Sequence, residues 1–220
     1  MNYKYKMELD STTRCVEEYC FTTTFGIRET SKTELYKKEI SDKINNIKDN
    51  FKSSTATLSI FKNTNKLNCA KMVSDNMNIQ ELIKHTIFII PNTNKIYLDY
   101  TLFKTYAHDQ IYDILIQYVI HLFNVCIESH NSFELHIDLN TFSISAAQRY
   151  KPAIQKFCNE CLSNGTDMML HLSIFRIYNT PSMIDSISSI FRPFISDQIK
   201  NNVEFINRKD SVNHKEMLFL

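Results

Sequence analysis

Apolar residues between positions 179 and 195 recur with the period of a helix. They fall at the i, i+3, i+4, i+7 spacing that gathers them on one stripe, with mostly serines opposite. Pro181 suits the first turn of this helix, and Pro193 predicts that it kinks or ends about three turns later. Burying a large apolar side chain gains about 1.5–3 kcal/mol, so the stripe must cover protein core, an acyl chain or a partner. The stripe consists of Met183, Ile184, Ile187, Ile190, Phe191, Phe194 and Ile195.

The first 80 residues show weaker patterns, which predict a small α+β region. Alternating apolar residues within 1–30 favour one or two strands, and residues 33–52 place apolar side chains on one face of an amphipathic surface helix. The strand-like run 55–61 is followed by an Asn-rich turn and a second run, 67–73. This arrangement predicts a β-hairpin.

Strands and helices alternate regularly after residue 80. The helix predicted over 107–129 is apolar over most of its circumference, so we expect it to be buried on several sides. Strands joined by helical crossovers lie side by side and parallel, so this region predicts an α/β fold with a mainly parallel sheet. The predicted elements are strands over 86–90 and 95–100, the helix over 107–129, a strand over 133–139, a helix from Ser145 (or about Lys151, if Pro152 delays it) to Ser163, a strand over 168–178, the striped helix and a strand over 203–206.

The composition indicates one sizeable domain, which we divide into an N-terminal region of residues 1–80 and a domain of residues 81–220. The chain has 220 residues, of which 43% are hydrophobic, so it can bury a real core. A formal net charge of +1 with scattered arginines provides no field for steering toward nucleic acid. The only two glycines, Gly26 and Gly165, exclude a glycine-rich phosphate loop.

The cysteines and the N-terminal residues indicate a cytoplasmic protein. No apolar signal segment precedes the six cysteines, so we expect them to be reduced thiols. Cys158 and Cys161 form a lone C-x-x-C pair within a predicted helix, where buried thiols are favoured over a metal or redox site. There is no apolar run of 18 residues, so no membrane span is expected. The bias toward Lys, Asn and Ile is typical of an AT-rich genome, such as that of a virus or a protist.

Two segments carry a resemblance to a known family. Residues 137–147, IDLNTFSISAA, and residues 176–206, RIYNTPSMIDSISSIFRPFISDQIKNNVEFI, resemble the CRAL-TRIO lipid-transfer family. The first resembles the family's Asp-Leu-Lys-Gly strand end and Ser-x-Ser helix start. The second resembles its Asn-x-Pro turn, gating helix with Lys-Pro-Phe, and final strand. The chain departs from the family at Thr141, which replaces the glycine, and it lacks the Tyr-Pro-Glu and Leu-Pro…Gly-Gly elements and the usual helical N-terminal lobe.

The resemblance implies a non-catalytic lipid-binding protein whose striped helix is the lid of an apolar pocket above the sheet. It implies exchange of one lipid or phospholipid at a membrane surface, with no cofactor besides that ligand. Arg192 matches the lysine of Lys-Pro-Phe, and with Lys200 and Arg208 it is a candidate for contacting a lipid phosphate, as in a phosphoinositide. The candidate pocket residues are Phe133, Leu135, Ile137, Leu172, Ile174, Met183, Ile187, Ile190, Phe191 and Phe194.

Three polar residues raise the alternative of catalysis. His136, His171 and Asp138 are predicted on neighbouring strands, where they have the chemistry of metal ligands or an acid–base pair. No nucleophile motif such as G-x-S-x-G accompanies them. We therefore expect no catalytic site and no metal site, and we expect Asp138 to accept backbone N–H groups at the turn into the next helix.

Two other functions are compatible with the pattern. A ligand-free interaction module on the same scaffold would explain the missing family elements, and a homodimer through the 181–195 helix would cover the stripe. A regulatory domain similar to STAS domains would share the βαβ pattern, although the Asp-Ser-Ser-Gly helix start of that family is absent. A dry core with a large exposed patch would distinguish both from a lipid-binding protein.

Overall fold

The computed structural model describes residues 30–54, 62–163, 168–194 and 197–220. The strands predicted before residue 30 and over 55–61 lie outside these ranges. Within the described residues, strands and helices after residue 80 follow the predicted order.

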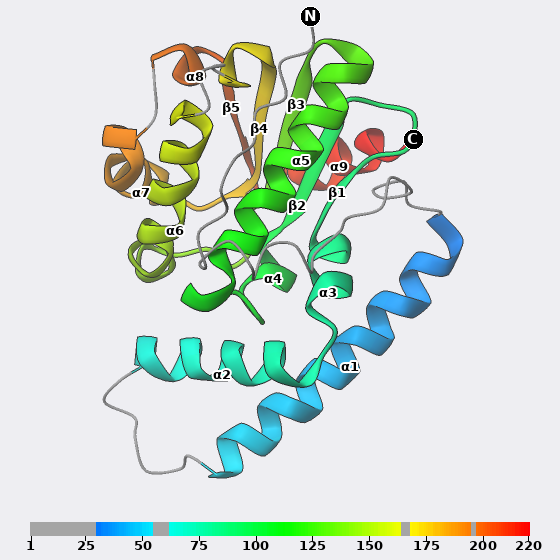
Figure 1. Ribbon diagram of the computed structural model, residues 1–220, viewed down its shortest axis with the longest axis vertical. Coiled ribbons are helices and arrows are strands. Elements are labelled where there is room, and N and C mark those ends of the chain that lie inside the picture. Colours follow the sequence, from blue (N-terminus) through cyan, green and yellow to red (C-terminus); the bar gives the residue numbers. More distant parts are fainter. Residues whose placement is uncertain (1–29, 55–61, 164–167, 195–196) are drawn as a thin grey trace, which may run out of the picture.

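Five strands of the described chain form one sheet in the order β1-β2-β3-β4-β5 (Figure 1). β1 and β2 form an antiparallel hairpin, whereas β2 to β5 are parallel neighbours. Right-handed crossovers between successive parallel strands place the connecting helices on the same face of the sheet. The predicted α/β fold with a mainly parallel sheet is confirmed. The strands are β1 (Ile87–Ile89), β2 (Lys95–Asp99), β3 (Phe133–Asp138), β4 (Leu172–Thr180) and β5 (Val203–Asn207).

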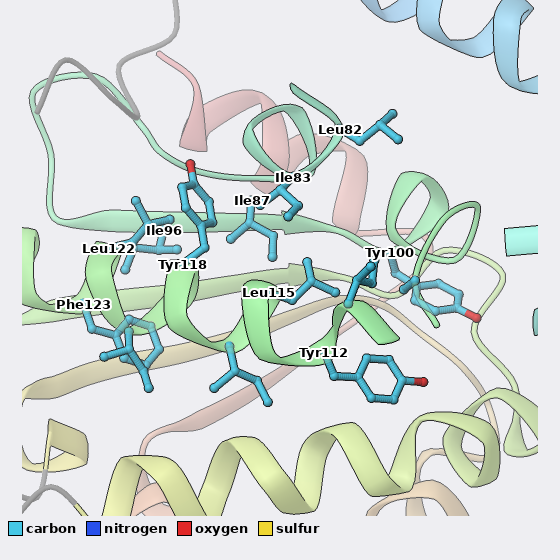
Figure 2. Packing of buried hydrophobic residues seen from close by; sticks show 14 of the residues in the cluster. Leu82, Ile83, Ile87, Ile96, Tyr100, Tyr112, Leu115, Tyr118, Leu122 and Phe123 are labelled. Carbon is cyan, nitrogen blue, oxygen red and sulfur yellow. The ribbon is translucent and has the colours of Figure 1, made fainter. Parts of the chain in front are cut away.

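The main core lies between the sheet and helices α5 (Tyr112–His130) and α6 (Ile144–Ser163). α5 lies along the front of the sheet in Figure 1, and it is buried on several sides, as its sequence predicts. Figure 2 shows Tyr118 and Leu122 of α5 beside Ile87 and Ile96 of the strands. The buried strand residues of this core include Ile87, Ile96 and Phe133, one from each of β1, β2 and β3.

The start of α6 differs in detail from the prediction. Ser143, rather than Ser145, accepts the backbone N–H of Ala146 through its side chain (3.3 Å), so Ser143 caps the helix. Pro152 does not delay the start and lies inside α6. Tyr150, two residues before the proline, is buried in the core, and such packing holds a helix together across the lost N–H bond.

The opposite face of the sheet is covered by a helix that the sequence did not indicate, α9 (Ser211–Leu218), drawn in red in Figure 1. Leu218 joins a second, smaller core on this face with Tyr97, Tyr178 and Ile206. Phe219 packs edge-on against Tyr97 at 5.2 Å between ring centroids. The sheet is thus covered by helices on both faces, which suits a mainly parallel sheet.

The N-terminal part of the described chain is helical. Residues 67–73 belong to α2 (Lys62–Asn76), so the hairpin prediction is wrong there. Ala70 and Val73 are buried one helical turn apart, and α2 packs on α1 (Thr30–Ser54), where Ile40 and Ile44 are buried. The predicted amphipathic helix is confirmed as α1. This tertiary packing overrides the weak strand propensity of 67–73.

Shorter elements complete the described chain. The strand predicted from residue 168 begins only at Leu172, because 168–171 form a 3₁₀ turn. The short elements are α3 (Ile79–Thr86), α4 (Tyr100–Phe103), η2 (Asp109–Ile111), η3 (Met168–His171), α7 (Ile184–Phe191), η4 (Arg192–Phe194) and α8 (Asp197–Asn201).

Candidate functional site

One face of β3, β4 and β5 carries rows of apolar side chains that become more exposed toward the edge of the sheet. Ile137, Ile177 and Phe205 are partners in register across the three strands. The first two are half-buried and Phe205 is 50% exposed, whereas Ile96 of β2 on the same face is fully buried. We call the row Ile137, Ile177 and Phe205, together with Leu135, Phe175 and Val203 beside it, the apolar floor.

Helix α7 connects β4 to β5 and packs against α6 (Figure 1). As a crossover between parallel strands, it belongs to the face of the sheet that carries the apolar floor. Ile187 is buried, Ile190 and Phe191 are half-buried, and Met183 is 55% exposed. The predicted stripe is therefore only partly covered.

The start of α7 differs from the prediction, whereas its end agrees with it. The helix begins at Ile184 rather than in the turn at Pro181, whose carbonyl oxygen accepts the N–H of Ile184 at 3.0 Å. After Phe191 the chain tightens into the 3₁₀ turn η4, which contains Pro193. The predicted stop at this proline is confirmed, because a proline cannot continue the backbone bonding of the helix.

The predicted pocket residues of β3 and β4 do not share one site: some lie in the main core, some on the apolar floor and one on the opposite face of the sheet. Phe133 and Leu172 are fully buried in the main core, where Phe133 stacks on Phe123 at 4.2 Å. Leu135 and Ile137 belong to the apolar floor. Ile174 lies on the opposite face, because its partner in register is Glu134.

An irregularity in β4 causes this division. Phe133 pairs with Leu172 but Glu134 pairs with Ile174, so β4 has one extra residue at Ser173. A one-residue shift moves all following side chains to the other face. Phe175 and Ile177 therefore join the floor, together with Val203 and Phe205 of β5. A simple alternation along β4 could not identify them.

The three predicted phosphate-binding cations are all exposed. Arg192 lies in η4 directly after α7, Lys200 lies in α8, and Arg208 follows β5. The side chain of Phe194 lies outside the part that the structure describes. The other predicted lid residues lie together, because all of them belong to α7 or its N-cap. They are Met183, Ile187, Ile190 and Phe191.

The turn that leads into α7 is fixed by a buried polar cluster. Asn179 donates its side-chain amide to Asp138 Oδ1 (2.6 Å), and its backbone N–H donates to Ser211 Oγ of α9 (2.7 Å). Lys215 of α9 donates to Asp138 Oδ2 at 2.7 Å. Burial alone would raise the pKa of Asp138, but the bonds from Lys215, Asn179 and the Asn140 N–H outweigh it and hold the pKa below its usual value.

Asp138 also accepts the backbone N–H of Asn140 at 2.9 Å, which confirms the role expected for it at the strand end. His136 is buried on the face opposite the floor, between Tyr178 (2.8 Å) and Glu134 (3.0 Å), and burial lowers its pKa. His171 instead bonds the carbonyl oxygen of Asn131. The structure does not bring the two histidines together, because His136 is in register with Arg176, five residues beyond His171.

The thiols of α6 and the apolar helix α5 are the other features that could carry chemistry or contact a membrane. Among the described residues, no group of three or more His, Cys, Asp or Glu side chains could hold a metal ion. Cys158 is a half-buried thiol and Cys161 a buried one, and burial raises the pKa of Cys158. In the part of the chain described, one helical stretch, Asp109–His130, has the length and apolarity of a membrane span. Half of its apolar portion is buried inside the protein, and the core helix of a globular domain can have the same length and composition.

These features define an α/β domain with a partly open apolar floor and an amphipathic helix on the same face. The model of the family described as the CRAL/TRIO domain matches residues 66–217, and the chain belongs to this family. CRAL-TRIO proteins are generally lipid-binding and not catalytic. A comparison with curated proteins finds no match. Among solved structures, the crystal structure of Sfh5 is similar, with 12% identity and a TM-score of 0.46 over 66% of this chain; the match spans 56% of the Sfh5 chain.

Proposed function

We propose that this protein holds one lipid between the apolar floor and helix α7 and exchanges it at a membrane surface without catalysis. The observation that carries the proposal is the partial exposure of both surfaces on one side of the sheet. Ile177 and Phe205 on the floor, and Met183 and Ile190 at α7, are only partly covered by protein. An acyl chain would remove this apolar area from water, at about 25 cal/mol per Å².

Three exposed cations, one directly after α7 and one on either side of β5, support contact with a phospholipid or a membrane. Arg192, Lys200 and Arg208 are exposed, so their side chains remain accessible to lipid phosphates. Arginine suits such a contact because its guanidinium binds phosphate in a bidentate manner. An open α7 would also present its apolar stripe to the bilayer interface. The proposal therefore includes a cytoplasmic protein that visits membranes and takes a phospholipid, such as a phosphoinositide, as its ligand.

A pair of β4 variants tests whether the floor is the binding surface. Ile177→Gln places a polar side chain on the floor, whereas Ile174→Gln makes the same change on the opposite face of the same strand. Both residues are half-buried, so their effects on folding are comparable. We expect Ile177→Gln to reduce uptake of a fluorescent phospholipid from vesicles about tenfold or more, because a buried amide without a partner costs a few kcal/mol.

The control is Ile174→Gln, which we expect to take up the lipid like the original protein. Equal uptake by both variants would contradict a ligand on the floor. A protein that takes up no lipid and forms a dimer covering α7 would instead support the interaction module.

A further inference from the structure

The last residues of β4, which lead toward α7, have an irregular backbone. Asn179 has a positive φ of 52°, a left-handed conformation that asparagine adopts more readily than most residues other than glycine. The register between β4 and β5 shifts here, because Ile177 pairs with Phe205 and Thr180 with Asn207. The extra residue forms a bulge, and a bulge bends its strand and changes the direction of the chain that follows.

Contacts from two distant segments hold Asn179 in this conformation. Its side chain donates to Asp138 at the end of β3, and its N–H donates to Ser211 at the start of α9. Asp138 is 5% exposed and Ser211 is fully buried, so water cannot readily replace either bond. Ser211 is itself fixed by donating to the carbonyl oxygen of Asn207 (2.7 Å).

The same cluster connects α9, on the far face of the sheet, with α7 on the near face. Lys215 of α9 donates to Asp138, and Asp138 accepts from Asn179, which lies five positions before Ile184, the first residue of α7. We infer that Asn179 is the hinge of α7 and that Asp138 and Ser211 are positioning residues that hold the hinge closed. This inference rests on the proposed function, in which α7 is the movable cover of the ligand.

Hydrogen exchange of the lipid-free protein, measured by mass spectrometry, tests the hinge independently of lipid binding. Asn179→Gly keeps the positive φ accessible but removes the bond to Asp138. We expect exchange over residues 184–191 to become about tenfold faster, as for loss of a bond to a buried carboxylate. The matched control is Asn131→Gly, which changes another asparagine with positive φ (57°) at the end of α5, away from α7.

A second variant, Ser211→Ala, removes the hydroxyl group that accepts the Asn179 N–H and donates to the Asn207 carbonyl. We expect it also to speed exchange over 184–191, with residues 112–130 of α5 unchanged. Exchange over 184–191 that stays at the original rate in both variants would overturn the hinge, and so would an equal rise over 112–130, because that rise reports general loosening.

Lipid release separates this inference from the proposed function. If the protein loads with fluorescent phospholipid, we expect Asn179→Gly to release it faster than Asn131→Gly does. If no lipid loads, the proposed function fails, while the exchange rates of the lipid-free protein still decide whether Asn179 is a hinge.

Discussion

Thr141 adopts a left-handed backbone conformation, with φ of 67°. It stands at the position where the CRAL-TRIO motif Asp-Leu-Lys-Gly has its glycine. A β-branched residue is strained there by about 1–2 kcal/mol, since its Cβ crowds the following carbonyl. We expect Thr141→Gly to raise the free energy of unfolding by up to about 1 kcal/mol, part of the gain being offset by the greater freedom of glycine in the unfolded chain. Chemical denaturation measures this change.

The control for this prediction is Thr141→Ala, which keeps the Cβ but removes the hydroxyl that accepts from Lys104 at 2.6 Å. We expect no stabilisation from it. A glycine variant no more stable than the alanine variant would show that the backbone at this position is unstrained.

Asp138 shows how far single residues could be predicted from the sequence. Its local bond to the Asn140 N–H follows from the tendency of aspartate to bond the backbone two residues on, and this bond was expected. Its bonds to Asn179 and Lys215 join residues 41 and 77 positions away. The first depends on the pairing of β3 with β4 and the second on the packing of α9, and no local pattern indicates either.

At the scale of elements, α2 is tied to the segment before α5 through His108. The ring is 2% exposed, and its Nε2 lies 2.8 Å from Ser74 Oγ of α2. Burial lowers the pKa of His108, an effect that Asp109 and Asp75 only partly oppose. Well above pH 6.5, the ordinary pKa of histidine, the ring is neutral in the folded and unfolded states. As the pH falls below 6.5, the unfolded chain binds the proton first, so folding stability decreases.

We therefore expect His108→Gln to be less sensitive to acid. A glutamine does not titrate, so the fall in the free energy of unfolding between about pH 6.5 and 5 should be smaller in the variant than in the original protein. Buried His136 titrates in both proteins and cancels in the comparison. Identical slopes of unfolding free energy against pH would contradict a buried, neutral His108.

Elements with long, regular patterns were predicted well, and the others were not. α5 is apolar over most of its circumference and β3 carries alternating apolar residues, and both patterns extend over the full element. α9 buries only Ser211 and Leu218, which are too few positions to give a helical pattern. In α2 the burial of Ala70 and Val73 fits a helix, but a run as short as 67–73 does not distinguish a helix from a strand by its apolar residues alone.

At the scale of the whole molecule, the site depends on the register in which β3, β4 and β5 pair, and this register cannot be predicted from the sequence alone. The apolar floor exists as a row because the extra residue in β4 turns Phe175 and Ile177, instead of Ile174, toward α7's face of the sheet. The edge strand β5 leaves Phe205 half exposed. The sequence predicted the fold, the amphipathic cover and part of the floor, whereas the bulges and the contribution of β5 required the three-dimensional structure.

Native mass spectrometry of freshly purified protein, followed by organic extraction, tests the central claim most directly. We expect a species heavier than the 25.9 kDa chain by the mass of one lipid, recovered as lipid on extraction. A bare monomer that stays bare after incubation with mixed liposomes would contradict the claim that the floor and α7 hold a ligand. A bare dimer would contradict it as well, and would favour α7 as a protein interface.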